Sequence, residues 1–235
     1  LEFRRVLFRS KNIMPYITSC NVACGFHGGD PSTIKQTIET ALKNNVLVGA
    51  HPSFYDIEGF GRRKMNISSE DLEVALIYQI SSVKGIAESL GTKIHHVKAH
   101  GALYNMASQS DHIAKTIVEA VKKVDSNLKI YGPSGMRWKD IAESSEITYV
   151  SEIFSDRNYN DNLTLVDRKN ENAMITDSVK SLEHVRLMID EGKVLTVNGN
   201  LINIEAETVC IHGDQPNALE FAKKIYSYLK SRISK

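Results

Sequence analysis

The chain has 235 residues, 42% of them hydrophobic, and a formal net charge of +1. This length allows one sizeable domain or two small ones, with enough apolar residues for a full core. The near-zero charge points to neither nucleic acid nor a membrane surface as a partner, and no apolar run is long enough to span a bilayer.

The cysteine content predicts a reducing environment. Three cysteines are too few for a disulfide scaffold. Cys20 and Cys24 share one strand-like run and lie too far apart to bond to each other. No signal peptide with a cleavage site is recognisable. We therefore expect buried thiols in a cytoplasmic protein, with a CxxxC zinc site as an alternative that lacks a second pair.

The first ten residues differ from the rest of the chain. Leu1–Ser10, LEFRRVLFRS, places three arginines among Leu, Val and Phe. We interpret this segment as a non-native leader, which leaves residues 11–235 as a single domain. A short basic strand at a sheet edge is the alternative.

From there on, strand-like runs alternate with helical stripes. The predicted strands are 20–24, 46–50, 94–99, 128–131, 147–150 and 208–211, with 194–197 doubtful. The predicted helices are 33–43, 69–90, 111–124, 134–144, 177–191 and 217–233. Residues 53–65 and 154–172 form long polar loops of the kind that is often functional. The alternation predicts parallel strands with crossover helices, and closure into a barrel needs one more strand near the N-terminus.

The segment CNVACGFHGGDP, from Cys20 to Pro31, predicts a strand, a tight glycine loop and a helix start. Asp30 suits the N-cap and Pro31 the first helical turn. Gly28 and Gly29 let the backbone turn sharply and approach a ligand. His27 is left at the mouth of this turn.

The same pattern, an apolar run that ends in His followed by Gly or Pro, recurs at His51, His100 and His212. Because the carboxyl ends of parallel strands form the site in α/β folds, we predict that these histidines converge with His27. For each histidine alone, hydrogen bonding at a strand end is the simpler interpretation.

Four imidazoles together with Asp30 and Asp214 could bind zinc or another divalent ion. Their spacing is not that of a local metal motif, so a metal-free site of acids and bases is the favoured interpretation. For Asp30, an N-cap is the favoured role on the residues alone.

Several charged residues lie next to these strand ends. Arg62 and Arg63 follow glycines and could fork onto a carboxylate or phosphate, or form a solvated turn. Lys98 falls in a strand expected to be buried, where an ammonium group needs a partner or a catalytic task. Glu152, Asp156 and Arg157 could supply a general base or position water, or form a surface salt-bridge cluster.

Common catalytic motifs are missing from the sequence. There is no GxxxxGK[ST] phosphate loop and no GxGxxG after a strand. A GxSxG elbow is also missing, which disfavours a serine hydrolase.

Five segments taken together resemble the LamB/YcsF family: SCNVACGFHGGDP, VGAHPSFYDIEGFGRR, HVKAHGALYN, SEIFSDRNY and VCIHGDQPNA. The resemblance runs from about Ile13 to the last helix. It implies a seven-stranded-type (β/α) barrel, similar to the polysaccharide-deacetylase-like fold. Members open with a strand resembling D-L-N-x-D-x-G-E, which Leu1–Ser10 lacks. We therefore expect an incomplete or replaced first strand and reduced stability.

The resemblance also implies a function. It implies a hydrolase of cyclic amides that opens the lactam of 5-oxo-L-proline to L-glutamate with ATP, accompanied by Mg²⁺. The chain would be the first component of a cytoplasmic 5-oxoprolinase and would act with partner subunits B and C. Two alternatives stay open: a metal-dependent deacetylase or amidohydrolase, and a lactam-binding subunit without catalysis.

The residues that match the family's motifs supply the candidate site. Acid–base, positioning or charge-stabilising roles in catalysis are predicted for His27, Asp30, Lys98, His100, His212 and Asp214. Substrate or phosphate binding is predicted for Gly28, His51, Arg62, Arg63, Glu152 and Arg157. A metal ion, if bound, would be held by His27, His51, His100 and His212.

Overall fold

The chain divides into two compact units in the computed structural model, which describes residues 12–215 and 217–233. Among these residues, the first unit comprises 18–132 and 136–150, and the second comprises 12–17, 133–135 and the rest from 151 onward. The leader prediction for Leu1–Ser10, and the missing barrel strand expected there, lie outside the described residues.

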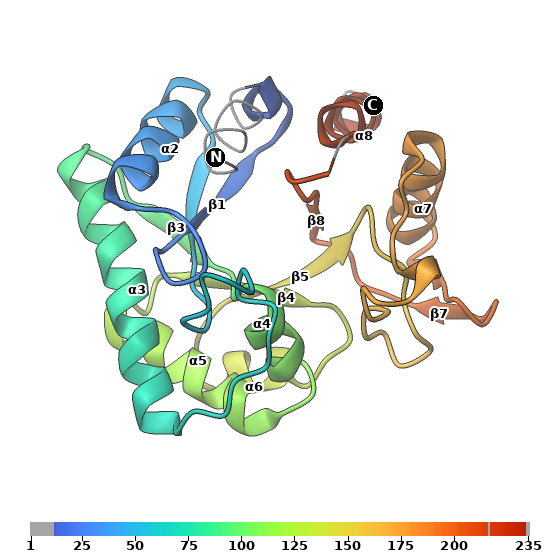
Figure 1. The fold of residues 1–235 in the computed structure, drawn as a ribbon. Helices are drawn as coiled ribbons and strands as arrows, with labels where there is room; N and C mark the ends of the chain where they lie inside the picture. Colours follow the sequence, from blue (N-terminus) through green and yellow to red (C-terminus); the bar gives the residue numbers. More distant parts are fainter. Residues whose placement is uncertain (1–11, 216, 234–235) are drawn as a thin grey trace. The chain divides into compact units, whose positions relative to one another are not determined.

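A six-stranded sheet has the order β1-β2-β3-β4-β5-β8 (Figure 1). Its strands are β1 Ser19–Ala23, β2 Leu47–His51, β3 Ile94–Val97, β4 Lys129–Pro133, β5 Tyr149–Phe154 and β8 Thr208–Cys210. The registered pairs β1/β2, β2/β3, β3/β4 and β5/β8 are all parallel. The predicted α/β architecture is confirmed, with six strands in the described part of the chain rather than seven, as expected for an incomplete barrel.

The first unit carries five of the described helices: α2 Pro31–Lys43, α3 Ser69–Ser89, α4 Gly101–Ala107, α5 Asp111–Val124 and α6 Trp138–Ser144. The predicted stripes form the core, since Ile34 and Ile38 of α2 and Leu76 and Ile80 of α3 are buried. Helix α3 packs against α5 (Figure 1).

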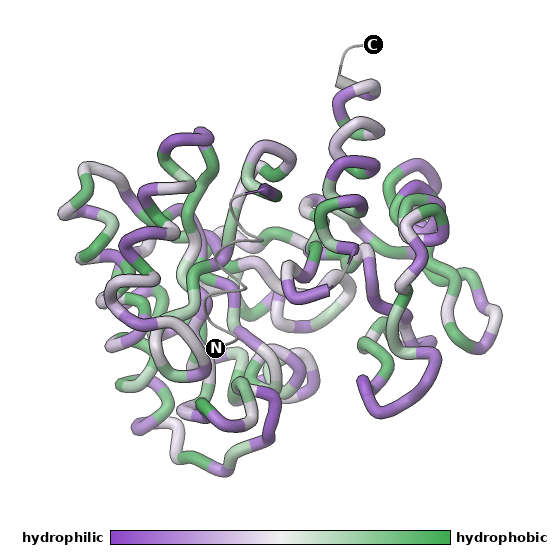
Figure 2. Tube along the Cα trace, turned by 45° about the horizontal axis from the view of Figure 1, so that its top comes forward, coloured by the Kyte–Doolittle hydropathy of each residue, from purple (hydrophilic) through white to green (hydrophobic). Residues whose placement is uncertain are grey.

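The second unit contains two short 3₁₀ turns, η1 Met14–Tyr16 and η2 Glu171–Ala173, and the helices α7 Ser178–Asp190 and α8 Ala218–Ile233. Helices α7 and α8 pack on each other, with Val185, Met188 and Phe221 buried. Hydrophilic and hydrophobic residues alternate along α8 in Figure 2, as an amphipathic helix requires. An antiparallel hairpin, β6 Lys193–Leu195 and β7 Leu201–Asn203, completes this unit.

Some predicted boundaries differ from the structure. Strand β5 continues to Phe154, so Glu152 lies within the strand and not after it. The reason is that two carboxylates bind Ser151, Glu207 its N–H and Glu205 its hydroxyl, so Ser151 stays buried in extended backbone. Helix α3 is capped by Ser68, whose hydroxyl accepts from the N–H of Asp71. Among the described residues, no helix is both long enough and apolar enough to cross a membrane.

Candidate functional site

Three of the four predicted histidines meet in the first unit. One ring nitrogen from each of His27, His51 and His100 lies within 4.8 Å of the others. His51 ends β2, while His27 and His100 stand in the segments that follow β1 and β3. His212 belongs to the second unit, so its convergence with the other three remains a prediction. We call His27, His51 and His100 the histidine cluster.

Two members of the histidine cluster, His51 and His100, are each held by a hydrogen bond to a backbone carbonyl oxygen and face each other with their other ring nitrogens. His51 Nδ1 lies 2.6 Å from the carbonyl oxygen of Lys98, and His51 Nε2 lies 3.0 Å from His100 Nδ1. His100 Nε2 lies 2.8 Å from the carbonyl oxygen of Phe60. A carbonyl oxygen can only accept, so His51 Nδ1 and His100 Nε2 both carry protons.

His27 is held differently from its two neighbours. Its side chain is 2% exposed, and its ring stacks on His100 with centroids 3.9 Å apart. Its Nδ1 is buried and has no hydrogen-bond partner. Burial, with repulsion from His100 and Arg62, lowers the pKa of His27 to about 3. Burial also holds the pKa of His51 well below its usual value, and His100, His27 and Lys98 add to this effect. His27 and His51 are therefore neutral imidazoles.

The glycine loop after β1 positions His27. Gly25 donates its N–H to the carbonyl oxygen of Gly28, which closes the turn at 2.9 Å. Gly29 has a φ of 84°, and a Cβ there would lie 2.9 Å from the carbonyl oxygen of Ala23. A side chain at this position would therefore force the backbone away from β1.

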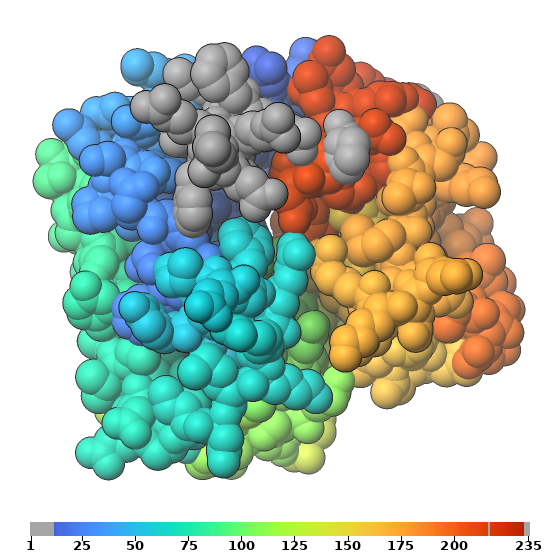
Figure 3. Space-filling view, viewed as in Figure 1, coloured from blue at the N-terminus to red at the C-terminus, as the bar shows by residue number. Residues whose placement is uncertain are grey.

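The loop between β2 and α3 covers the histidine cluster from one side. Asp56, 3% exposed, accepts from Arg63 and from the N–H of Gly59, which fixes the loop. This ion pair lowers the pKa of the Asp56 carboxyl group. Gly61 then passes so close that a Cβ would lie 2.8 Å from His100 Cδ2. In Figure 3 this loop, coloured teal, lies at the molecular surface, and the side chain of Arg63 is 62% exposed.

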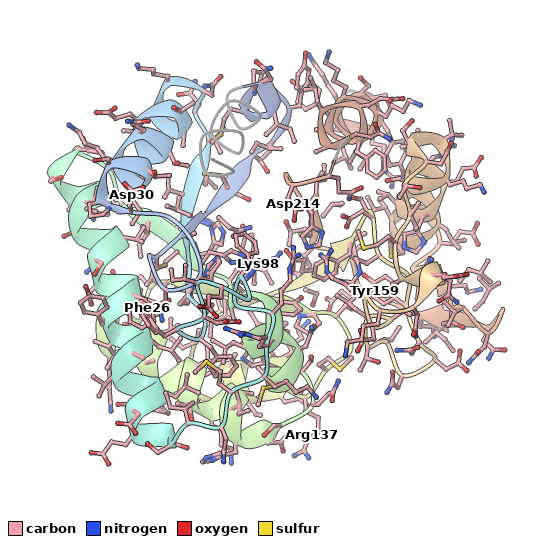
Figure 4. All side chains as sticks on the ribbon, in the orientation of Figure 1. Phe26, Asp30, Lys98, Arg137, Tyr159 and Asp214 are labelled. Atoms are coloured by element: carbon pink, nitrogen blue, oxygen red, sulfur yellow. The ribbon has the colours of Figure 1, made fainter. Side chains whose placement is uncertain are left out.

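Other predicted residues of the first unit have defined surroundings. Lys98 is 4% exposed, and its ammonium lies 5.8 Å from the ring centre of Tyr104. The guanidinium of Arg62 lies 5.2 Å from the ring centre of Phe60. Asp30 is exposed at the start of α2, where its carboxylate accepts from the N–H and hydroxyl of Thr33 (Figure 4). The predicted N-cap at Asp30 is thus confirmed.

The second unit contains a separate acid–base group around Asp156. This carboxylate is 0% exposed and lies 2.8 Å from His212 Nδ1. Gln215 also donates to it. Because a carboxylate only accepts, His212 carries its proton on Nδ1 and presents Nε2 as an acceptor. Arg168 Nη2 lies 3.3 Å from that nitrogen and donates to it.

Arg157, Glu152 and Asp214 also belong to the second unit. Arg157 is 4% exposed and donates to the carbonyl oxygens of Ala173 and Val166, so it holds the long loop after β5. Burial, with repulsion from Arg168, lowers its pKa to about 10. Glu152 is buried within β5. Asp214 is exposed in the turn before α8 (Figure 4). Substrate binding by Arg157 and Glu152, and catalysis by Asp214, stay predictions.

Sequence reasoning weighed Asp156 but did not choose it, and it missed Gln215 and Arg168. A surface salt bridge was the simple alternative for Asp156, and its complete burial rules that out. A signal was present in HGDQP, since His212 and Gln215 stand three residues apart after a strand. Arg168 gives no such signal because it lies in the middle of a polar loop.

Comparison with known proteins places this geometry in a family. The model of the LamB/YcsF family matches residues 4–234. The A subunit of 5-oxoprolinase from Bordetella pertussis is 45% identical over 213 residues, which cover 91% of this chain and 84% of that protein. The corresponding protein from Bacillus cereus is 45% identical over 215 residues, covering 91% and 85%. The crystal structure of a lactam utilization protein from Thermus thermophilus superposes with a TM-score of 0.88 at 35% identity, covering 95% of this chain and 89% of that one.

Proposed function

The chain belongs to the LamB/YcsF family, and we propose that it opens the lactam ring of 5-oxo-L-proline to give L-glutamate. In this proposal it is the A subunit of a cytoplasmic, ATP-dependent 5-oxoprolinase that works with subunits B and C. The observation that carries the proposal is the 45% identity, over 91% of the chain, to proteins named as the A subunit of 5-oxoprolinase. All three cysteines are buried thiols, which agrees with a reducing compartment.

The Asp156 group suits the chemistry of lactam opening. Water adds to the ring carbonyl carbon, the C–N bond breaks, and the leaving nitrogen gains a proton. One residue must therefore take a proton from water and another, or the same one, must return a proton to nitrogen. His212 can do both through Nε2, because Asp156 fixes the proton on Nδ1. In this proposal Arg168, which donates to Nε2 in the free protein, turns to the substrate oxygen, so that Nε2 is free to accept a proton and the guanidinium supplies positive charge for the developing oxyanion.

ATP is the co-substrate in this proposal. The sequence has no P-loop. The N-terminus of α2, which follows Gly28, is occupied by the carboxylate of Asp30, and a second anion there would be repelled. We therefore assign ATP hydrolysis to the assembled complex.

Phosphate release from ATP that depends on 5-oxoproline tests the proposal, with the purified chain mixed with subunits B and C. Formation of glutamate that needs all three proteins supports it. His212→Gln should abolish turnover, whereas His112→Gln, on the exposed side of α5 in the first unit, serves as the matched control. Binding of 5-oxoproline without turnover in any combination of the three proteins would instead indicate a lactam-binding role without catalysis.

A metal-dependent amidohydrolase is the second candidate function. The histidine cluster favours it, since three imidazoles whose ring nitrogens lie within 4.8 Å of one another form a common donor set for catalytic zinc. Loss of glutamate formation after treatment with a chelator, and recovery with Zn²⁺, would favour this candidate over the first.

A further inference from the structure

We propose that His27, His51 and His100 form a binding site for one divalent transition-metal ion of the zinc, cobalt or nickel type. The proposal concerns the first unit and stands independently of the lactamase reaction. It follows from a conflict among the hydrogen bonds of the histidine cluster.

The conflict arises between the two facing nitrogens of His51 and His100. Each neutral imidazole carries one N–H. The N–H of His51 donates to the carbonyl oxygen of Lys98, and the N–H of His100 donates to the carbonyl oxygen of Phe60. His51 Nε2 and His100 Nδ1, 3.0 Å apart, are then both unprotonated. Two lone pairs at this distance repel unless a cation lies between them.

A metal ion satisfies both nitrogens. Two imidazole nitrogens bound to one tetrahedral ion, each at about 2.1 Å, stand about 3.4 Å apart, so the facing nitrogens, now 3.0 Å apart, need to separate only slightly to bind one ion. A third proton would also bridge them, but it would place a positive charge on a half-buried ring beside His27 and Lys98.

His27 supplies the third donor. Its Nδ1 is buried without a hydrogen-bond partner, which is costly for a polar atom unless something binds it. The ring now stacks on His100 with planes 6° apart, so it must turn to aim a nitrogen at an ion that lies in the plane of His100. No hydrogen bond at Nδ1 opposes this rotation.

The surroundings fix the ligands, as metal sites require. The carbonyl oxygens of Lys98 and Phe60 accept hydrogen bonds from the outer ring nitrogens of His51 and His100. Hydrogen bonds of this kind fix the ring orientation of histidines that bind a metal through their other nitrogen. Gly61 leaves room for the rings, since any Cβ there would lie within 3 Å of both His27 and His100. The charge of Lys98 opposes a cation, so it should weaken binding without abolishing it.

Direct binding measurements on the full chain test this proposal. After removal of metal with a chelator, Zn²⁺ is titrated by calorimetry and Co²⁺ by visible absorption. We expect one ion per chain, and an affinity at least about 10-fold lower in His27→Gln and His100→Gln. His95→Gln is the matched control, because His95 lies in β3 of the same unit outside the histidine cluster. Lys98→Met should tighten binding.

The outcomes separate the explanations. A stoichiometry near zero for both ions would overturn the proposal and leave a shared proton between His51 and His100. Equal affinity in the wild type, His27→Gln and His100→Gln would show binding elsewhere on the chain and also overturn it. Circular dichroism of each variant checks that the fold is kept. His27→Gln removes no hydrogen bond at Nδ1, so it still gives an answer if His100→Gln fails to fold.

Discussion

The carbonyl oxygen of Gly61 accepts a hydrogen bond from the N–H of Ala102 at 2.9 Å. This bond ties the loop after β2 to the first turn of α4. The two chain segments approach so closely that a Cβ on Gly101 would lie 2.4 Å from the same oxygen. The loop is therefore part of the wall around His27 and His100, and the absence of a side chain at both Gly61 and Gly101 allows this contact.

Replacing Gly61 by Ala should destabilise the protein. Gly61 has a φ of 67°, which L-residues adopt at a cost. The added Cβ would also lie 2.9 Å from His27 Cβ, so the loop or the rings must move. We expect a loss of about 1–3 kcal/mol in the free energy of unfolding, measured by urea denaturation.

Gly85→Ala is the matched control for this prediction. Gly85 lies within α3, and a Cβ there meets nothing within 4 Å. Alanine should stabilise the helix by up to about 1 kcal/mol. If Gly61→Ala were as stable as Gly85→Ala, the close packing of the loop on the two histidines would be wrong.

Much of this fold could be predicted because its elements are long and periodic. Helix α5 was predicted with its observed bounds, since its apolar residues keep helical spacing over four turns. Helix α4 was missed because its seven residues, GALYNMA, are mostly buried and carry no polar face to mark a helical period. Strand β7 was missed because it has three residues and is defined by its partner β6.

The site was less predictable than the fold. The histidine cluster could be predicted because each of its members follows an apolar run that marks a strand end, and such runs can be recognised in a short stretch of sequence. The Asp156 group depends on residues 56 and 59 positions apart, which are joined only by folding. The residues next to Asp156 in the sequence do not indicate that its carboxylate is completely buried.

Asp30 should contribute to stability as a helix cap. Its carboxylate accepts from the N–H of Thr33, which satisfies one of the free N–H groups of α2. Asp30→Ala should cost about 1 kcal/mol, and Asp30→Ser should recover most of it. Urea denaturation of the two variants checks this. Equal stability of Asp30→Ala and the wild type would contradict the role of the cap.

Buried His96 should make the protein less stable in acid. The side chain is 0% exposed, with Nε2 donating to Asn21 Oδ1, and burial lowers its pKa to about 3. In the unfolded chain the pKa returns to about 6.5. The unfolded state therefore binds a proton first as the pH falls. Stability from this group is complete above about pH 6.5 and is lost progressively down to about pH 3, by up to about 4 kcal/mol.

Urea denaturation between pH 7 and pH 3.5 measures this effect. Glutamine at position 96 does not titrate and can still donate to Asn21, so His96→Gln should show a flatter loss of stability with falling pH. His112→Gln is the control, because His112 is exposed. Identical pH profiles for His96→Gln and the wild type would mean that His96 titrates normally.

Asp156→Asn should impair turnover far more than substrate binding. The carboxylate holds the proton of His212 on Nδ1, which leaves Nε2 as the acceptor beside Arg168. An asparagine can present an N–H to that nitrogen, and His212 would then carry its proton on Nε2, facing a donor and unable to take a proton from water. We expect kcat to fall by about 10²–10⁴ with little change in KM, by analogy with other aspartate–histidine pairs.

The ¹⁵N chemical shifts of the His212 ring report this tautomer directly, a readout that a merely structural role would leave unchanged. Asp161→Asn is the matched control: Asp161 lies in the same unit and binds Thr196 and Asn198 away from His212. It should keep its kcat. A shift of the His212 tautomer with unchanged kcat would show that Asp156 orients a histidine that plays no part in the reaction, and it would transfer the proton-accepting role to another residue.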